Sequence, residues 1–267
     1  MERGEGEGVT AQVSEIEIRH CETLDEYKQC VRLESLTWGI DTPVPSSMFV
    51  VAHHTGGQIL GAFSEGKMIG FTMAVAGLRA GQLFLHSHMT AVLPEYRNRG
   101  VGRRLKLFQR QDALKRGIRV VEWTFDPLEL KNAHFNLVRL GAVARRYIPN
   151  CYGITESPLH VGLPTDRLVA EWWLDSERVK NILADNAVPS KDTAARIELP
   201  TDVGDIRAKD RIAGERVQSA AREQFEKHFA DGYVATSIER RNSEITEYIL
   251  ERAEELAGLK LPKIQAE

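Results

Sequence analysis

Hydrophobic and polar positions along the first half of the chain predict alternating strands and helices. Residues 15–20 alternate with period two, which favours a strand, whereas residues 24–38 place apolar side chains at helical spacing. The turn Glu65-Gly66 separates two strand-like runs, which predicts a hairpin. The predicted strands are 15–20, 58–64, 67–76, 82–92, 118–126 and 143–148, and the predicted helices are 24–38, 48–53, 100–116 and 129–140.

The second half begins near Ser157-Pro158 and carries no motif that we can link to chemistry. Its pattern predicts a strand over 166–174, a short helix over 177–186, irregular segments over 187–204, a long amphipathic helix over 206–229 and strands over 233–239 and 244–252. We therefore predict a disordered tail over 1–14, a mixed α/β domain over 15–155 and a C-terminal α+β extension over 156–267.

Composition excludes several classes of protein. The 267 residues carry 35 basic and 38 acidic side chains, a formal charge of −3, so nothing predicts a nucleic-acid partner. No apolar run is long enough to cross a bilayer, and the N-terminus lacks the apolar segment of a secretory signal. The three cysteines, Cys21, Cys30 and Cys151, are expected to be reduced thiols. We predict a cytoplasmic protein with no membrane partner.

The informative segment is the glycine turn that joins the predicted strand 82–92 to the predicted helix 100–116. A helix that starts there directs unpaired backbone N–H groups at one point, and Gly100 and Gly102 let an anion approach the main chain. The alternative is an ordinary turn before a solvated basic helix face. Residue 105 is leucine, so the turn is not a dinucleotide fingerprint, and no P-loop lysine follows. Five basic side chains are expected to attract phosphate: Arg97, Arg99, Arg103, Arg104 and Lys106.

The run V-L-P-E-Y-R-N-R-G-V-G-R-R-L, from Val92 to Leu105, resembles the acetyl-CoA-binding motif of the GNAT acyltransferase superfamily. Arg97, Gly100 and Gly102 fill the fixed positions of that motif, and the predicted order of strands is that of the family. The resemblance covers about residues 15–153. It implies the GNAT acyl-CoA N-acyltransferase fold, an acetyl-CoA or other acyl-CoA co-substrate and an amine acceptor.

The resemblance also implies roles for single residues. The amides of Arg99, Gly100, Val101, Gly102 and Arg103 would hold the diphosphate, and the pantetheine arm would bond to main chain near Ala91 and Val92, in a gap between strands 82–92 and 118–125. Asn132 or Asn136 would contact the arm. Leu137 stands where the family places the tyrosine that protonates the thiolate, so Tyr147 and Tyr152 become the candidates for that role, and a nearby water is the alternative.

Attack by an amine needs a group that accepts its proton. His86 and His88 lie on one face of the strand before the motif, and Glu122 lies on the neighbouring strand. These three are our candidate catalytic residues, and the alternative is that each is a hydrogen-bonded, half-buried polar side chain. The two histidines could also bind zinc, but no third ligand is evident, so we predict no metal site.

A closer resemblance joins the chain to a subgroup of GNAT proteins with a C-terminal extension. It rests on D-P-L-x-x-x-N-A-x-x-N-L from Asp126, on Asn150 to Gly153, and on T-D-R-L-V-A-E-W from Thr165. Some members are associated with amino-acid N-succinylation, which implies succinyl-CoA and a small-molecule amine as substrates. A succinyl group and an amino-acid acceptor both carry a carboxylate that would need a cation, and the candidates are Arg79, Arg139, Arg145 and Arg146.

Two questions stay open at this point. A non-catalytic acyl-CoA-binding or regulatory module is the alternative to an enzyme. The extension could cover the acceptor site, form a homodimer interface or be a degenerate second GNAT-like half.

Overall fold

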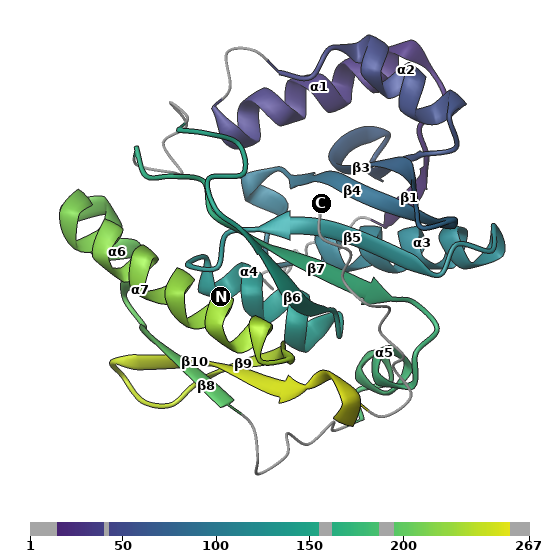
Figure 1. Cartoon of the computed structure of the whole chain (residues 1–267). Coiled ribbons are helices and arrows are strands. Elements are labelled where there is room, and N and C mark those ends of the chain that lie inside the picture. Colours follow the sequence, from purple (N-terminus) through teal and green to yellow (C-terminus); the bar gives the residue numbers. More distant parts are fainter. Residues whose placement is uncertain (1–14, 40–42, 155–161, 187–194, 257–267) are drawn as a thin grey trace, which may run out of the picture.

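A ten-stranded mixed sheet forms the frame of the computed structural model, which describes residues 15–39, 43–154, 162–186 and 195–256 (Figure 1). The strand order is β1-β2-β3-β4-β5-β7-β6-β9-β10-β8, and β4 and β5 form its parallel pair. The strands are β1 (Ile16–His20), β2 (Gln58–Ser64), β3 (Lys67–Arg79), β4 (Gln82–Val92), β5 (Val120–Phe125), β6 (Val143–Ile148), β7 (Arg167–Trp173), β8 (Ala195–Pro200), β9 (Tyr233–Arg240) and β10 (Ile245–Arg252). The predicted mixed α/β fold class is therefore confirmed.

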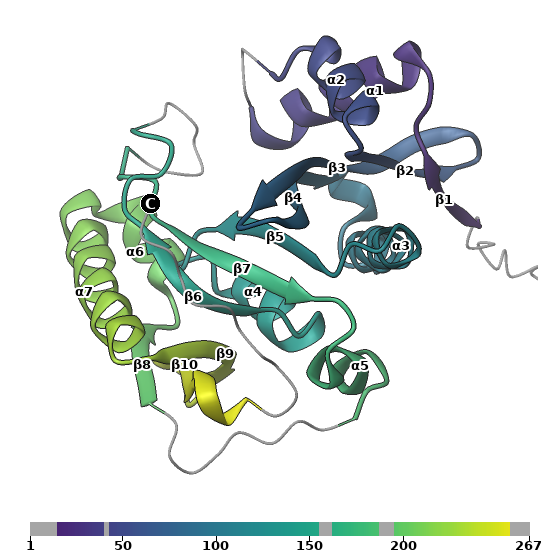
Figure 2. The same ribbon diagram turned by 45° about the vertical axis from the view of Figure 1, so that its right-hand side comes forward.

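Helices cover both faces of the first half of the sheet (Figures 1 and 2). On one face, α1 (Leu24–Trp38) and α2 (Ser46–His54) bury Tyr27 and Phe49 against Phe71. Thr23 and Glu26 form a capping box, which fixes the start of α1. On the other face, α3 (Val101–Lys115), which follows the short helix η1 (Pro94–Tyr96), packs Val101 and Leu105 on β2 and β3.

The C-terminal half continues the same sheet. β7 lies between β5 and β6, although it follows residue 155 in the chain. The next junction of the sheet is weaker, because β6 and β9 pair at one position, Ala144 with Ala235. The division at 155 stays a prediction, and the sheet itself joins β7 to the first half. The remaining helices are α4 (Leu130–His134), its continuation η2 (Phe135–Arg139), α5 (Glu177–Leu183), α6 (Val203–Lys209), α7 (Arg211–Ala230) and η3 (Ala253–Glu255).

Two predictions about this half are wrong. The segment predicted to be irregular contains β8, whose buried Ile197 and Leu199 alternate with exposed residues over a run too short to stand out. The long helix is two helices, because Asp210 leaves the helical conformation (φ −141°) and caps α7 through the amide of Ala213. The predicted tail 1–14 and the start of the second region at Ser157-Pro158 lie outside the described residues.

Candidate active site

The first feature of the site is a gap between β4 and β5. The two strands pair only at Leu85–Val121 and His86–Glu122. Beyond that point β4 continues along β3 to Val92, and β5 continues along β7 to Phe125. Each strand therefore leaves a backbone edge unpaired toward the other, and the two edges diverge from a vertex. This is the gap that the resemblance implied.

A β-bulge in β4 lies at that vertex. Met89 is paired with Met73 and Ser87 with Ala74, so His88 is the extra residue. The hydroxyl group of Thr72 on β3 fastens the bulge, because Oγ1 bonds to the carbonyl oxygen of Met89 and contacts the hydroxyl group of Thr90, both at 2.8 Å. A bulge bends the strand that carries it, and this one lies where the pairing of β4 with β5 ends.

The N-terminus of α3 forms the second feature. Gly100 precedes the helix with φ +78°, a conformation that favours glycine, and no side chain caps the helix. The first intrahelical bond runs from the amide of Arg104, so the amides of Val101, Gly102 and Arg103 have no partner among the described residues. A Cβ atom on Gly102 would meet no atom within 4 Å. Packing of the chain thus gives no reason for this glycine, whereas an anion on the main chain would.

Charge around the helix start favours an anion as well. The first turn of α3 contains no acidic residue, although acidic side chains stabilise a helix N-terminus. Arg97, Arg99 and Arg103 form no ion pair within the described part of the chain, and Arg97 Nε donates to the carbonyl oxygen of Val92 at 3.1 Å. Arg97 therefore links the end of β4 to the glycine turn.

Two of the five basic residues predicted to attract phosphate do something else. Arg104 donates to the carbonyl oxygen of Ile16 and so fastens β1 to α3. Lys106 is only 3% exposed and points into the sheet, where its ammonium donates to Ser87. The prediction for Lys106 was wrong because a lysine on an amphipathic helix is usually at the solvated face.

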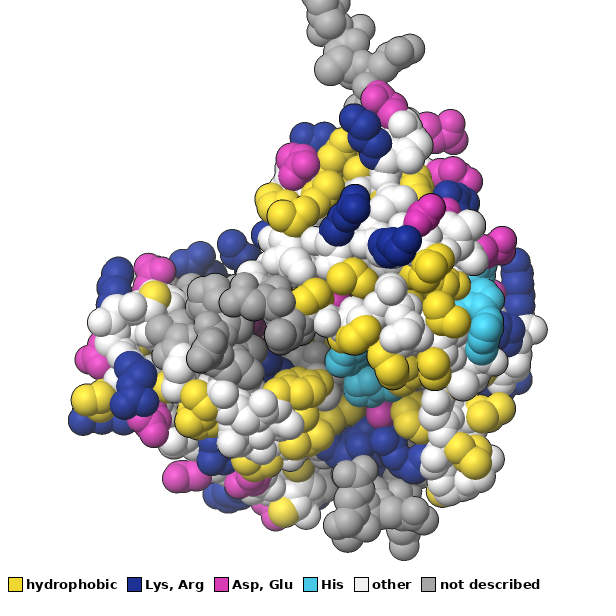
Figure 3. Space-filling model, turned by 90° about the horizontal axis from the view of Figure 1, so that it is seen from above, with side chains coloured by type: hydrophobic (Ala, Val, Ile, Leu, Met, Phe, Trp, Pro, Cys, Tyr) yellow, Lys and Arg dark blue, Asp and Glu magenta, His cyan; other side chains and the backbone are white. Residues whose placement is uncertain are grey.

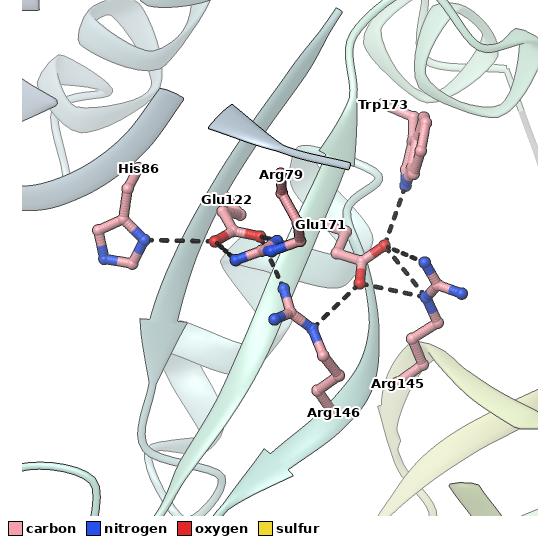
Figure 4. A network of polar contacts seen from close by, with 7 residues as sticks. All are labelled: Arg79, His86, Glu122, Arg145, Arg146, Glu171 and Trp173. Carbon is pink, nitrogen blue, oxygen red and sulfur yellow. Dashed lines mark hydrogen bonds and ion pairs between the residues drawn. The ribbon is translucent and has the colours of Figure 1, made fainter. Parts of the chain in front are cut away.

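A cluster of charged side chains lies around Glu122 and Glu171 (Figure 4). Glu122 on β5 accepts from Arg79 on β3 at 2.8 and 3.0 Å and from Arg146 on β6 at 2.6 Å, and the Nδ1 atom of His86 lies 3.6 Å from its Oε1. Arg146 also reaches Glu171 on β7, which Arg145 contacts through Nε at 3.1 Å. The cluster thus links β3, β4, β5, β7 and β6 beside the vertex.

Glu122 is held ionised by this cluster. Burial raises the pKa of its carboxyl group, but the contacts with His86, Arg79 and Arg146 outweigh burial and lower the pKa to about 2. A carboxylate of such low basicity is a poor general base near neutral pH. Its geometry fits another role, in which it orients His86 and holds the two guanidinium groups.

Of the predicted set, His88 has a pKa better suited than that of Glu122 to accepting a proton near neutral pH. Its side chain is exposed, yet partial burial and the neighbouring His86 lower the pKa of its imidazole below the usual 6.5. The imidazole is consequently neutral at pH 7 and able to accept a proton. The two histidine rings lie 6.4 Å apart. Figure 3 shows histidine side chains beside a group of Lys and Arg side chains on the face seen from the α1–α2 end.

The two candidate tyrosines are separated by the structure. Tyr147 donates to Asp166 at 2.7 Å and stacks on Phe225 of α7, and burial and Asp166 raise the pKa of its hydroxyl group. The structure therefore does not bring Tyr147 to the histidines. Tyr152 is half-exposed, and its hydroxyl group bonds to Thr124 on β5 at 2.8 Å, two residues beyond Glu122.

The helix after β5 carries the two predicted asparagines. Asn132 is exposed on α4, whereas Asn136 lies in η2, a single π-helical turn, and is 2% exposed. Its Nδ2 atom is buried and has no partner among the described residues. An unsatisfied buried donor is unfavourable, so Asn136 fits a ligand contact better than a structural role. Leu137 is fully buried in the core.

Sequence reasoning missed the partners in the charged cluster. Glu171 lies within the apolar run R-L-V-A-E-W-W, and a carboxylate inside such a run was the available signal. Arg79, Arg145 and Arg146 were considered only as cations for a substrate carboxylate. No group of three or more possible metal ligands occurs in the described ranges, and no described helix is long and apolar enough to span a membrane.

Comparison with known proteins bears on the N-terminal part. Residues 20–141 match the profile of the family described as Acetyltransferase (GNAT) family. No curated protein sequence matches the chain.

Solved structures resemble part of the chain at low sequence identity. A ribosomal-protein-S18-alanine N-acetyltransferase from Escherichia coli is 18% identical, covers 59% of this chain and 92% of its own length, and gives a TM-score of 0.47. A GNAT acetyltransferase from Streptococcus pneumoniae is 18% identical with coverages of 59% and 98% and a TM-score of 0.47. An aminoglycoside 6′-acetyltransferase type Ii is 16% identical with coverages of 59% and 96% and a TM-score of 0.45. The match to the GNAT acetyltransferase family therefore covers residues 20–141, which are less than half of the chain.

Proposed function

We propose that this chain transfers an acetyl or succinyl group from acyl-CoA to the primary amine of a small molecule, in a ternary complex. The observation that carries the proposal is the loss of pairing between β4 and β5 beyond His86 and Glu122. An extended pantetheine arm needs an unpaired strand edge of this kind to bond to main chain. The unpaired amides of α3 at the far end of β4 supply donors for the diphosphate.

The reaction needs no covalent enzyme intermediate. The amine nitrogen attacks the thioester carbonyl carbon, the carbon–sulfur bond breaks, and CoA leaves as a thiolate. In this proposal His88 accepts the proton from the amine, while Glu122 holds His86 beside it. The hydroxyl group of Tyr152 is hydrogen-bonded to Thr124 on β5, beyond the vertex, and donates a proton to the thiolate.

The charged cluster supports a substrate that carries a carboxylate. Three guanidinium groups, of Arg79, Arg145 and Arg146, gather around the carboxylates of Glu122 and Glu171 beside His86. Either a succinyl group or an amino-acid acceptor would bring the complementary charge. This makes amino acids the first acceptors to try, ahead of amines without a carboxylate.

Release of CoA thiol tests the proposal. The purified chain is mixed with acetyl-CoA or succinyl-CoA and a panel of amino acids and neutral amines, and free thiol is followed against a control without acceptor. We expect thiol release that depends on the acceptor. The Tyr152→Phe variant should release thiol more slowly but bind acyl-CoA with unchanged affinity. Binding of CoA without release for any amine would favour the non-catalytic module instead.

A further inference from the structure

A buried lysine lies at the vertex of the gap. Lys106 on α3 is 3% exposed, and its ammonium donates to Ser87 Oγ at 2.8 Å and to Gln109 Oε1 at 3.1 Å. The same nitrogen lies 4.0 Å from the centroid of the Trp123 ring. No carboxylate of the described chain forms an ion pair with it. Ser87, Gln109 and Trp123 are the polar and aromatic groups that face it, from β4, α3 and β5.

The position of these partners is specific. Leu85–Val121 and His86–Glu122 are the pairs that join β4 and β5, so Ser87 and Trp123 would form the next pair in the parallel register. They do not pair, and the lysine nitrogen contacts both of them. The side chain of Lys106 thus bridges β4 and β5 at Ser87 and Trp123, the first residues after the last pair of the two strands.

Stability of the fold does not explain a lysine at this place. A buried ammonium without a carboxylate partner is unfavourable, and an apolar side chain of similar length would fill the same space. Burial lowers the pKa of Lys106 to about 7, which is the direction expected for a desolvated amine. The hydrogen bond to Ser87 and the contact with the face of Trp123 need a long donor rather than an apolar chain.

The bridge also reaches the bulge. Ser87 Oγ lies 3.4 Å from Thr72 Oγ1, which in turn contacts the hydroxyl group of Thr90 at 2.8 Å. Thr90 is half-buried on β4 beyond the vertex, two residues after His88. A change in the position of the lysine nitrogen would therefore be transmitted to the strand segment that carries His88.

We propose that Lys106 is a positioning residue that sets the separation of β4 and β5 at the vertex and thereby places the thioester end of the acyl-CoA arm against His88. This inference rests on the proposed function, because it assigns the vertex to the thioester. The diphosphate site lies at the other end of β4, so loss of the bridge should affect turnover more than acyl-CoA affinity.

The test compares three variants with the unmodified protein. Lys106→Met keeps the length of the side chain and removes its donors, Ser87→Ala breaks the same bridge from β4, and Lys115→Met changes an exposed lysine of the same helix as a control. Turnover, acyl-CoA KM and tryptophan emission are measured for each. We expect kcat to fall at least about tenfold in Lys106→Met and less in Ser87→Ala, with KM within about threefold.

The outcomes separate this inference from the proposed function. If the unmodified protein neither binds acyl-CoA nor releases thiol, the proposed function fails and the inference fails with it. If the unmodified protein is active and Lys106→Met and Ser87→Ala keep its kcat, the inference alone is overturned. A fall of kcat in both variants, with a shift of tryptophan emission in Lys106→Met and neither change in Lys115→Met, supports it.

Discussion

Replacement of Lys106 by methionine should make the protein more stable at low pH. Burial lowers the pKa of Lys106 from 10.5 to about 7, which corresponds to about 5 kcal/mol at about 1.4 kcal/mol for each tenfold change in the protonation equilibrium. The contact of the ammonium with the Trp123 ring offsets up to about 2 kcal/mol of this. We therefore expect Lys106→Met to exceed the unmodified protein by about 2–3 kcal/mol in unfolding free energy at pH 6.

The pH dependence gives a sharper test than the size of the difference. Between about pH 7 and pH 10.5 the unfolded chain holds a proton on this lysine and the folded chain does not, so stability of the unmodified protein rises with pH. Two pH units at about 1.4 kcal/mol each predict that the advantage of Lys106→Met shrinks by about 2–3 kcal/mol between pH 6 and pH 9.

Urea unfolding at pH 6 and pH 9 measures both quantities. Lys115→Met is the matched control, because Lys115 is exposed on the same helix and its replacement should give the same small difference at both pH values. An advantage of Lys106→Met that does not change between the two pH values would contradict a buried amine that loses its proton near neutrality.

Three further predictions concern the site. Glu122→Gln should lower the unfolding free energy by about 2–3 kcal/mol, because Arg79 and Arg146 lose a buried partner. The stabilisation by Glu122 is fully present above pH 4.5 and is lost as the pH falls toward about 2. The unfolding free energy of the variant should therefore depend less on pH in that range. His88→Ala should lower turnover more than acyl-CoA affinity and remove an acid limb of kcat/KM that lies below pH 6.5, and an unchanged pH–rate profile would exclude His88 as the base. Asn136→Leu should raise the unfolding free energy by about 1 kcal/mol, since it removes an unsatisfied buried amide, and should weaken acyl-CoA binding about tenfold. Unchanged affinity in calorimetry would show that the Nδ2 atom of Asn136 does not contact acyl-CoA.

Local patterns predicted the first half of the fold well. The helical spacing of apolar residues predicted a helix over 24–38, which are the bounds of α1 in the structure. Gly100 marked the start of α3, because a turn with positive φ before a helix needs glycine. These features depend on residues close together in the chain, which is why sequence alone predicted them.

Contacts between distant segments could not be predicted in this way. Arg79 and Arg146 meet on Glu122 because β7 enters the sheet between β5 and β6, and no local pattern indicates that insertion. The orientation of Lys106 depends on which side of α3 faces the vertex. Its spacing to the buried residues Gln109 and Ala113 placed it on the inner side, a signal that its charge obscured.

The roles of the two tyrosines show the same limit. Tyr147 and Tyr152 are similarly close in sequence to the position occupied by Leu137. Only the packing of α7 on β6 shows that Tyr147 is bound to Asp166, while Tyr152 reaches Thr124 on β5.

Calorimetric titration of acetyl-CoA into the unmodified protein, Gly102→Ala and Gly102→Asp tests the central claim most directly. A Cβ atom at this position meets no protein atom, and an aspartate in the first turn of α3 favours the helix, so both variants should stay folded and Gly102→Asp should be slightly more stable. We predict that the aspartate weakens binding at least about a hundredfold, because its carboxylate occupies the place of the diphosphate, while alanine has a smaller effect. Binding of equal affinity in the folded Gly102→Asp variant would contradict the placement of acyl-CoA at the start of α3.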